Sequence, residues 1–183
     1  MARRIAYQGD PVITLEDVAR QCQAEVEDLQ RELVEQVIIP GVTAQAEART
    51  GAAIRPAEYE EEWPESYGSG HALDVGQAGE VVSVKRVLGD GTTEDLADAY
   101  RLERGQRESF LHFPNGRPAG VLRIRYKAAY DPAAHPGVKL WLLMHAATAH
   151  EHRETMVNGT SLAELPSGFT DALLAEIEVP PRF

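Results

Sequence analysis

The sequence has little cysteine, an excess of acidic over basic residues and no long apolar run. Its 183 residues include one cysteine, Cys22, so the chain cannot form an internal disulfide bond. Lys and Arg number 18 against 29 Asp and Glu, which gives a formal net charge of −11 at pH 7. Proteins that grip nucleic acid need clustered cations to neutralise phosphates, so this balance argues against that class. Long apolar runs are also missing, and we expect neither a signal peptide nor a membrane span.

The rest of the composition is that of an ordinary globular protein. Hydrophobic residues make up 43% and charged residues 26% of the chain, so wholesale disorder is not expected. The length suits one domain with room for an inserted subdomain. We therefore expect a soluble protein that is made in a reducing cytoplasm.

Residues 137–155 predict a long helix with two apolar faces. At about 100° per residue, Trp141 and His145 fall on one face, while Leu140 and Met144 fall on another. The first face comprises Val138, Trp141, Leu142, His145, Ala149 and His152. The second comprises Leu140, Met144, Ala147 and Glu151.

Each of these two faces needs a partner. A small domain can cover the first face with its other helix, but Leu140 and Met144 would then stay in water at a cost of roughly 1.5–3 kcal/mol each. We therefore expect the second face to be a subunit interface that packs against another copy of the chain. The alternative is a central helix that its own chain covers on both sides.

Residues 14–51 predict a helical region with one buried side. Thr14 is a candidate N-cap with Asp17 in the capping-box position, and Gly51 suits the position after the last turn. Pro40 should end or kink the helix, because it has no backbone N–H to donate. The buried stripe comprises Leu15, Val18, Ala19, Cys22, Val26, Leu29, Leu33 and Val37. The pattern leaves open whether this region is one helix or two.

Residues 55–130 predict an inserted antiparallel β subdomain, because the apolar period changes from about 3.6 to 2. Candidate strands lie at residues 58–63, 81–88, 92–96, 100–102, 110–113 and 122–127. A second helical part follows at residues 137–177, with a helix break at Asn158-Gly159, a loop at residues 162–166 and a final helix at residues 169–177. With helices at both ends of the sequence and strands between them, the predicted fold class is α+β, a helical core from N- and C-terminal segments with an inserted β subdomain.

Two of the predicted strands carry opposite charges. The first carries Glu58, Glu60 and Glu62 on one face. The last carries Arg123, Arg125 and Lys127 on one face. We expect Arg123 and Arg125 to pair with Glu60 and Glu62, within one subunit or across to a neighbour, whereas the alternative is a solvated sheet face. The whole acidic run is interpreted as a charged surface, and the alternative is an acid/base pair; its members are Glu58, Glu60, Glu61, Glu62 and Glu65.

The histidines of the long helix do not have the spacing of a metal site. A helical pair of ligands needs a separation of three or four residues, so that both reach one ion. His145 and His150 diverge by about 140° around the axis, and His145 and His152 stand about 10 Å apart along it. Cys22 is not expected to be a nucleophile, because an apolar helix face raises the pKa of a thiol. We expect no catalytic residue, metal or cofactor.

The order of the elements resembles that of a known family. The segments that carry the resemblance are ITLED (13–17), AEARTG (46–51), VVSVKRVL (81–88), DGT (90–92), YRL (100–102), VLRIRYKAAY (121–130), EHRE (151–154), LP (165–166) and ALL (172–174). Together they resemble the head-to-tail connector, or adaptor, proteins of tailed bacteriophages, in the branch with a β-rich insertion between its helices. The resemblance spans nearly the whole chain.

The resemblance implies a structural virion protein without catalysis. It implies a closed, dodecameric ring that docks beneath the portal, meets a tail or stopper protein of the neck, and extends the DNA channel. DNA would pass without specific binding, and an acid-rich wall would prevent it from sticking. The protein would be made in the host bacterial cytoplasm and reside in the virion at the head–tail interface. The expected ring contacts are Leu140, Met144, Ala147, Glu151, Arg123, Arg125, Glu60 and Glu62.

The C-terminal residues 178–183 predict an extended tail, because two adjacent prolines favour extended backbone. In the connector interpretation, the docking segment for the portal is Val179, Pro180, Pro181, Arg182 and Phe183. Phe183 would serve as its apolar anchor. The alternative is a frayed terminus.

Two functions from other classes compete with a connector. One is a small metal-dependent hydrolase that uses the His-rich helix. The other is a regulatory module that binds DNA through Arg3 and Arg4, within an N-terminal arm at residues 1–11 that precedes any periodic pattern. The acidic balance of the following residues counts against the second.

Overall fold

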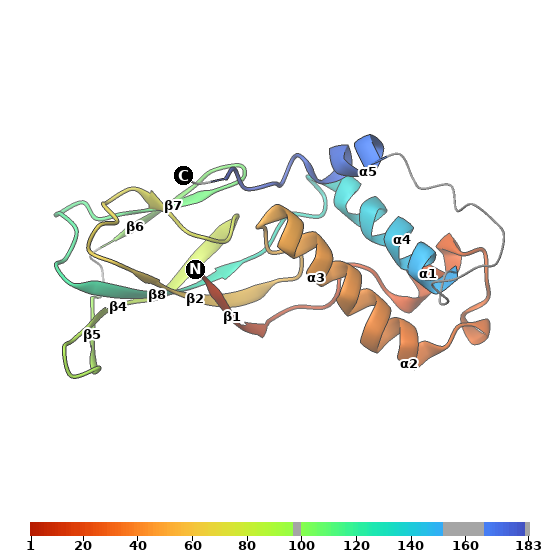
Figure 1. Cartoon of the computed structure of the whole chain (residues 1–183), viewed down its shortest axis with the longest axis horizontal. Coiled ribbons are helices and arrows are strands. Elements are labelled where there is room, and N and C mark those ends of the chain that lie inside the picture. Colours follow the sequence, from red (N-terminus) through yellow and green to blue (C-terminus); the bar gives the residue numbers. More distant parts are fainter. Residues whose placement is uncertain (97–99, 152–166, 182–183) are drawn as a thin grey trace. The chain divides into compact units, whose positions relative to one another are not determined.

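The computed structural model describes residues 1–96, 100–151 and 167–181. The chain forms two compact units, shown with their elements in Figure 1. The helical unit comprises residues 11–50 and 131–176, and the β-rich unit comprises residues 1–10, 51–130 and 177–183. About 33% of the structure is helical and 28% is strand, which confirms the α+β class.

Helix α1 (Leu15–Gln21) begins at the predicted capping box. The Asp17 amide donates to the Thr14 hydroxyl at 3.3 Å, and the Thr14 amide donates to the Asp17 carboxylate at 3.2 Å. The helix ends where Gln23 adopts a left-handed conformation with φ of 54°. The Ala24 amide then donates to the Ala19 carbonyl at 3.0 Å, which is the bond pattern of a Schellman motif. The region is therefore broken here, and a 3₁₀ turn follows at Val26–Asp28.

The second helix of this region continues through Pro40. It consists of α2 (Arg31–Leu33), a π-helical stretch (Val34–Ile38) and α3 (Ile39–Thr50). The Ile39 amide donates to the Val34 carbonyl, five residues earlier. This widening immediately before Pro40 accommodates a residue without an N–H. Of the two predicted outcomes, an end or a kink at Pro40, the end is therefore wrong, because the helix continues to Thr50. The helix ends as predicted at Gly51, whose φ is 69°.

Helices α4 (Pro136–Glu151) and α5 (Ser167–Leu174) complete the helical unit. Lys139 of α4 pairs with Asp17 at 3.0 Å, and Arg49 of α3 pairs with Asp171 of α5. Helix α5 ends three residues before the predicted Ile177. The predicted end of the long helix, the break at Asn158-Gly159 and the loop at residues 162–166 lie outside the described residues. Among the helices that are described, none is long and apolar enough to cross a membrane.

The β-rich unit contains two antiparallel sheets. The larger has the order β1-β2-β8-β4-β5, and the smaller has the order β3-β7-β6. Their bounds are Arg3–Tyr7 (β1), Ala57–Trp63 (β2), His71–Ala72 (β3), Ala78–Val87 (β4), Thr93–Asp95 (β5), Arg101–Arg104 (β6), Ser109–His112 (β7) and Val121–Ala128 (β8). The predicted strands are thus confirmed within a few residues. The expected N-terminal arm is instead the edge strand β1, because Arg3–Tyr7 pairs with β2.

The core of this unit follows the alternation that the sequence predicted. Strand β2 pairs with β8 over seven residue pairs, from Ala57–Ala128 to Trp63–Leu122. The inward side chains of β8, Leu122, Ile124 and Tyr126, are fully buried. Leu111 of β7 in the smaller sheet, and Phe113 just after this strand, belong to the same hydrophobic cluster. Residues from both sheets therefore share one core.

Glu61 departs from the expected charged surface. Its side chain is 2% exposed and lies on the core side of β2, between Tyr59 and Trp63. Three donors reach its carboxylate: the Trp63 indole at 2.6 Å, the Asp74 amide at 3.0 Å and the Tyr126 hydroxyl at 3.0 Å. A buried carboxylate is tolerated only when its oxygens are hydrogen-bonded in this way.

The substitution E61Q tests this cluster. An amide would turn one acceptor oxygen into a donor that faces another donor, so we expect the free energy of unfolding to fall by about 1–3 kcal/mol. E62Q is the matched control, since Glu62 is exposed on the opposite face and its surface pair with Arg123 contributes about 0–1 kcal/mol. Urea unfolding of both variants measures the difference, and equal losses would contradict a structural role for Glu61.

The same variant tests the pKa of Glu61. Burial, together with the nearby Asp74 carboxylate, raises the pKa of Glu61 in the folded chain. Between the pKa of an unfolded carboxyl and this raised value, the folded chain holds a proton that the unfolded chain has released. The Glu61 contribution to the free energy of unfolding therefore falls as pH rises. We expect the stability advantage of the parent chain over E61Q to shrink with rising pH, and an advantage that grows would contradict the direction of the shift.

Candidate assembly surfaces

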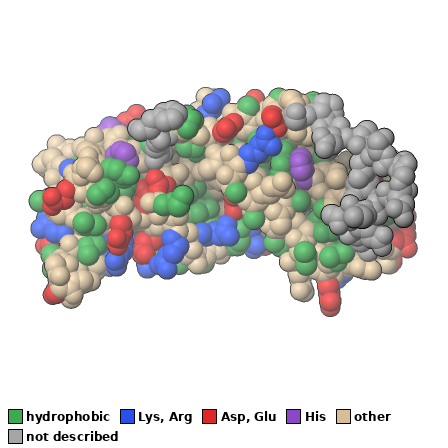
Figure 2. All heavy atoms as spheres, viewed as in Figure 1, with side chains coloured by type: hydrophobic (Ala, Val, Ile, Leu, Met, Phe, Trp, Pro, Cys, Tyr) green, Lys and Arg blue, Asp and Glu red, His purple; other side chains and the backbone are tan. Residues whose placement is uncertain are grey.

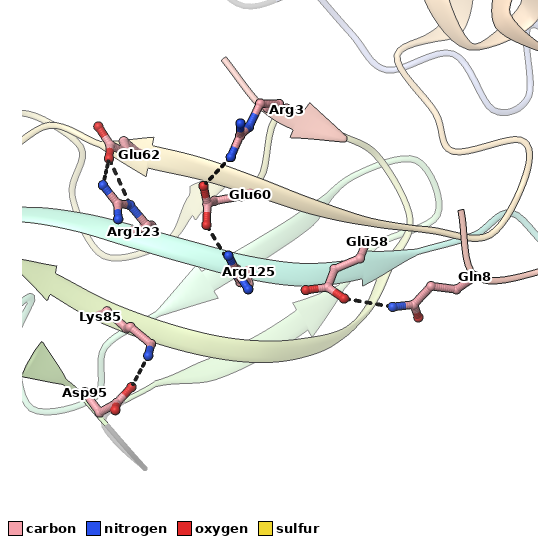
Figure 3. Close-up of polar contacts among 9 residues, drawn as sticks. All are labelled: Arg3, Gln8, Glu58, Glu60, Glu62, Lys85, Asp95, Arg123 and Arg125. Atoms are coloured by element: carbon pink, nitrogen blue, oxygen red, sulfur yellow. Dashed lines mark hydrogen bonds and ion pairs between the residues drawn. The ribbon is translucent and has the colours of Figure 1, made fainter. Parts of the chain in front are cut away.

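The solvent face of the larger sheet carries rows of opposite charge, which Figure 3 shows on β2, β8 and their neighbours. Arg123 lies opposite Glu62 in the β2–β8 register and donates to it at 2.7 Å. Arg125 lies opposite Glu60 and donates at 2.8 Å, while Arg3 reaches the other Glu60 oxygen at 3.1 Å. The hydrogen bond from Arg125 lowers the pKa of Glu60. The predicted pairing thus forms within one chain.

This in-chain pairing changes how the four charged residues can act at an interface. Glu60 is shared by two guanidinium groups, and Glu62 is already engaged by Arg123. Further pairs on the same sheet join Lys127 to Glu80 at 3.0 Å and Lys85 to Asp95 at 3.3 Å. Surface pairs such as these add little stability. A neighbouring copy would therefore meet a face on which most charges are already neutralised locally, and ring contact through these four residues stays a prediction.

Helix α4 has one side buried and one side open. Its buried side chains are Val138, Trp141, Leu142 and Ala146. On the predicted interface face, Leu140 is 40% exposed, Met144 and Ala147 are half-buried, and Glu151 is exposed. Within the described part of the chain, this face of α4 therefore leaves Leu140 exposed and Met144 and Ala147 partly accessible to solvent. Two members of the predicted inner face differ from expectation, because His145 is only half-buried and Ala149 is exposed.

The helix that contains Pro40 also exposes apolar residues. Val37 was predicted on the buried stripe, but its side chain is 59% exposed. The break after α1 and the π-helical stretch both change the helical phase, so a single wheel drawn through residues 15–37 misplaces its last member. Figure 2 shows hydrophobic side chains gathered over the α2 end of this unit.

The C-terminal segment is partly held by its own chain. Ile177 is fully buried, and Val179 is half-buried against Gly51 and Gly76. Pro180 and Pro181 are exposed. Arg182 and Phe183 lie outside the described residues. Of the predicted docking segment, Val179 is thus an attachment to the β-rich unit, and the two prolines are the described residues that are open to a partner.

The candidate chemical groups are spread apart. Among the described residues, no group of three or more His, Cys, Asp or Glu side chains could hold a metal ion. His145 stacks on Trp141 with ring centroids 3.6 Å apart, while His152 lies outside the described residues. Burial and the charge of Glu151 raise the pKa of the half-buried Cys22 thiol, as its helix position predicted. Arg3 binds Glu60, and Arg4 stacks over the Tyr7 ring at 4.1 Å, so both cations of the DNA-binding alternative are engaged within the chain.

The substitution G76A tests the attachment of the C-terminal segment. A Cβ atom at Gly76 would lie 2.3 Å from the Arg107 carbonyl oxygen and 2.6 Å from Cγ2 of Val179. We expect a loss of about 1–3 kcal/mol in the free energy of unfolding. We also expect a carboxypeptidase, which digests from the C-terminus, to remove residues N-terminal to Pro180 faster than in the parent chain. G79A is the control, because nothing lies within 4 Å of a Cβ there. Trimming of G76A at the parent rate would contradict this account of the segment.

Comparison with known proteins gives similarity in structure alone. No protein-family model matches the sequence, and no curated protein matches it. A chain of the structure titled "Virion of native gene transfer agent (GTA) particle" superposes with a TM-score of 0.78 at 15% identity, covering 100% of this chain and 97% of that chain. The same coverage holds for chains of "Neck of empty GTA particle computed with C6 symmetry" (TM-score 0.77, 13% identity) and "Neck of native GTA particle computed with C12 symmetry" (0.71, 16%). This chain has their fold over its whole length.

Proposed function

We propose that this protein is a structural component of a phage-type neck. In this role it forms a closed ring of twelve copies beneath the portal, joins head to tail through a stopper or tail protein, and lengthens the DNA channel. The observation that carries the proposal is the full-length structural match to chains from neck and virion structures, with a TM-score of up to 0.78. The order of sequence segments, which resembles that of connector proteins, supports the same role independently.

The open face of α4 supports self-association. Leu140 is 40% exposed and Met144 lies beside it, one turn later on the same helix. Solvent exposure of such side chains is unfavourable, and a second copy of the chain would remove it. If this face of one copy packs against a different face of the next copy, each copy uses both faces. Such a head-to-tail contact can repeat from copy to copy until the ring closes.

The charge of the chain suits a conduit for DNA. With a net charge of −11, a ring of twelve copies would be strongly acidic, so its wall would repel the phosphate backbone. The cations of the larger sheet do not oppose this, since Arg123, Arg125 and Lys127 are each paired with a carboxylate of the same chain. DNA would pass through such a ring without binding to it.

Imaging the protein with its portal tests the ring. We expect negative-stain micrographs of the purified protein mixed with the portal protein of its own particle to show twelvefold rings stacked on the portal. The control is the same mixture with the L140D variant, which should leave the portal bare because a carboxylate cannot be buried in an apolar contact. A protein that stays monomeric alone and with portal would overturn the proposed function.

Removing the last four residues tests the docking segment. We expect deletion of residues 180–183 to abolish portal binding while leaving the unfolding midpoint unchanged, because Ile177 and Val179 still attach the segment to the β-rich unit. A pull-down with portal protein and a thermal melt measure the two effects. The matched control replaces the same four residues with a Gly-Ser sequence of equal length. Unchanged portal binding by the deletion variant would dismiss this segment as the docking element.

A further inference from the structure

The helical unit has an open groove between its π-containing helix and the end of α4. The groove has a volume of about 560 Å³ and is lined by Leu33, Val37, Ile38, Gly41, Val42, Gln45 and Ala149. Five of the seven lining residues carry aliphatic side chains or a methyl group, and none of the seven is charged. Val37 is the exposed large hydrophobic residue of this lining, with a relative exposure of 59%.

The local backbone explains why this groove is open. The π-helical stretch Val34–Ile38 changes the phase of the helix, so Val37 faces solvent although the preceding residues of the stripe are buried or half-buried. Gly41 follows one turn later, and a Cβ atom at this position would find nothing within 4 Å. A side chain could therefore be accommodated at Gly41 without a clash, but glycine leaves the floor of the groove free.

The opposite side of α4 carries two apolar side chains, the exposed Leu140 and the half-buried Met144, here called the ridge. Leu140 and Ala149 are nine residues apart, which at about 100° per residue places them about 180° apart around the helix. The ridge residue Leu140 and Ala149, the α4 residue of the groove, therefore lie on opposite sides of α4. Two different faces on opposite sides are what a head-to-tail contact requires, because each copy then offers one face to each neighbour.

The uncharged lining of the groove favours a second copy of the chain as its occupant. A basic peptide would need acidic lining residues and a nucleic acid would need basic ones, but the lining has neither. Two copies that each carry −11 repel one another overall, and a contact between neutral, apolar faces adds no further charge repulsion to this. The groove and the ridge are both faces of this kind. The exposed large hydrophobic residues of the helical unit are Val37, Leu140 and Phe169, among the residues that the structure describes.

We propose that the ridge of one copy, Leu140 and Met144, inserts into the groove of the next copy, between Val37 and Ala149. The inference rests on the proposed ring function, and it identifies the groove as the surface that receives the ridge of the neighbouring copy. Phe169 is the other exposed apolar side chain of this unit, but it lies on α5, which has eight residues, whereas the ridge lies on a helix of sixteen. The ridge supplies two apolar side chains one helical turn apart, whereas Phe169 is the single exposed large hydrophobic residue of α5 among the residues that the structure describes.

Cysteine cross-linking of the full chain tests this contact, with the natural cysteine removed by C22S. We expect V37C/L140C, treated with a short bismaleimide, to give a ladder of dimers, trimers and longer species. A mixture of V37C alone and L140C alone should give heterodimers and nothing longer, because each chain then supplies one half of the contact. V82C/L140C is the matched control, since Val82 is 43% exposed but belongs to the β-rich unit.

The outcomes separate this contact from the ring itself. A ladder from V37C/L140C and none from V82C/L140C supports the proposal. The proposal is overturned by equal ladders from these two variants, or by the absence of any cross-linking. It is also overturned if V37C/F169C gives a ladder and V37C/L140C does not. Sedimentation and negative stain of the unmodified protein with portal report on the ring independently. Rings without V37C/L140C cross-links would therefore reject the ridge and groove but leave the proposed function standing.

Discussion

The pairing of β2 with β8 is the interaction on which the rest of the structure depends. These strands lie at the two ends of the inserted segment, and seven consecutive residue pairs hold them in register. The Tyr130 amide donates to the Ala53 carbonyl at 2.9 Å just beyond the pairing, so the chain enters and leaves the insertion at one place. A slip of one residue would move Trp63 and Leu122 to solvent and the paired arginines and glutamates into the core. The register therefore fixes the core and the charged face together.

Strong local signals made most of the architecture predictable. The alternation from Val121 to Ala128 matches β8, and the Thr14 and Asp17 pair matches the cap of α1. These elements are decided by side chains close in sequence, so a pattern of period 2 or 3.6 is enough to find them. The exposed position of Leu140 was also predictable, because one helix cannot turn two apolar faces toward a single partner.

Features decided by distant residues or by backbone detail were not predictable. Gln23 ends α1 in a left-handed conformation that usually favours glycine, and nothing in the local sequence marks it. Glu61 looks like one more acid in a charged run until Trp63, Tyr126 and the Asp74 amide are brought around it. The groove beside Val37 depends on the helical phase after a π-helical stretch, and periodicity calculated for a regular helix cannot show it. Burial of a polar group and exposure of an apolar one are tertiary outcomes.

The path of the backbone between the two units has a mechanical consequence. The chain passes from one unit to the other after residues 10, 50, 130 and 176, so four separate peptide segments connect them. A force that pulled the units apart would be shared by these four peptide segments instead of acting on a single linker. Cleavage of any one of these connections would still leave three intact. Four covalent connections therefore tie two units that each fold around residues of their own.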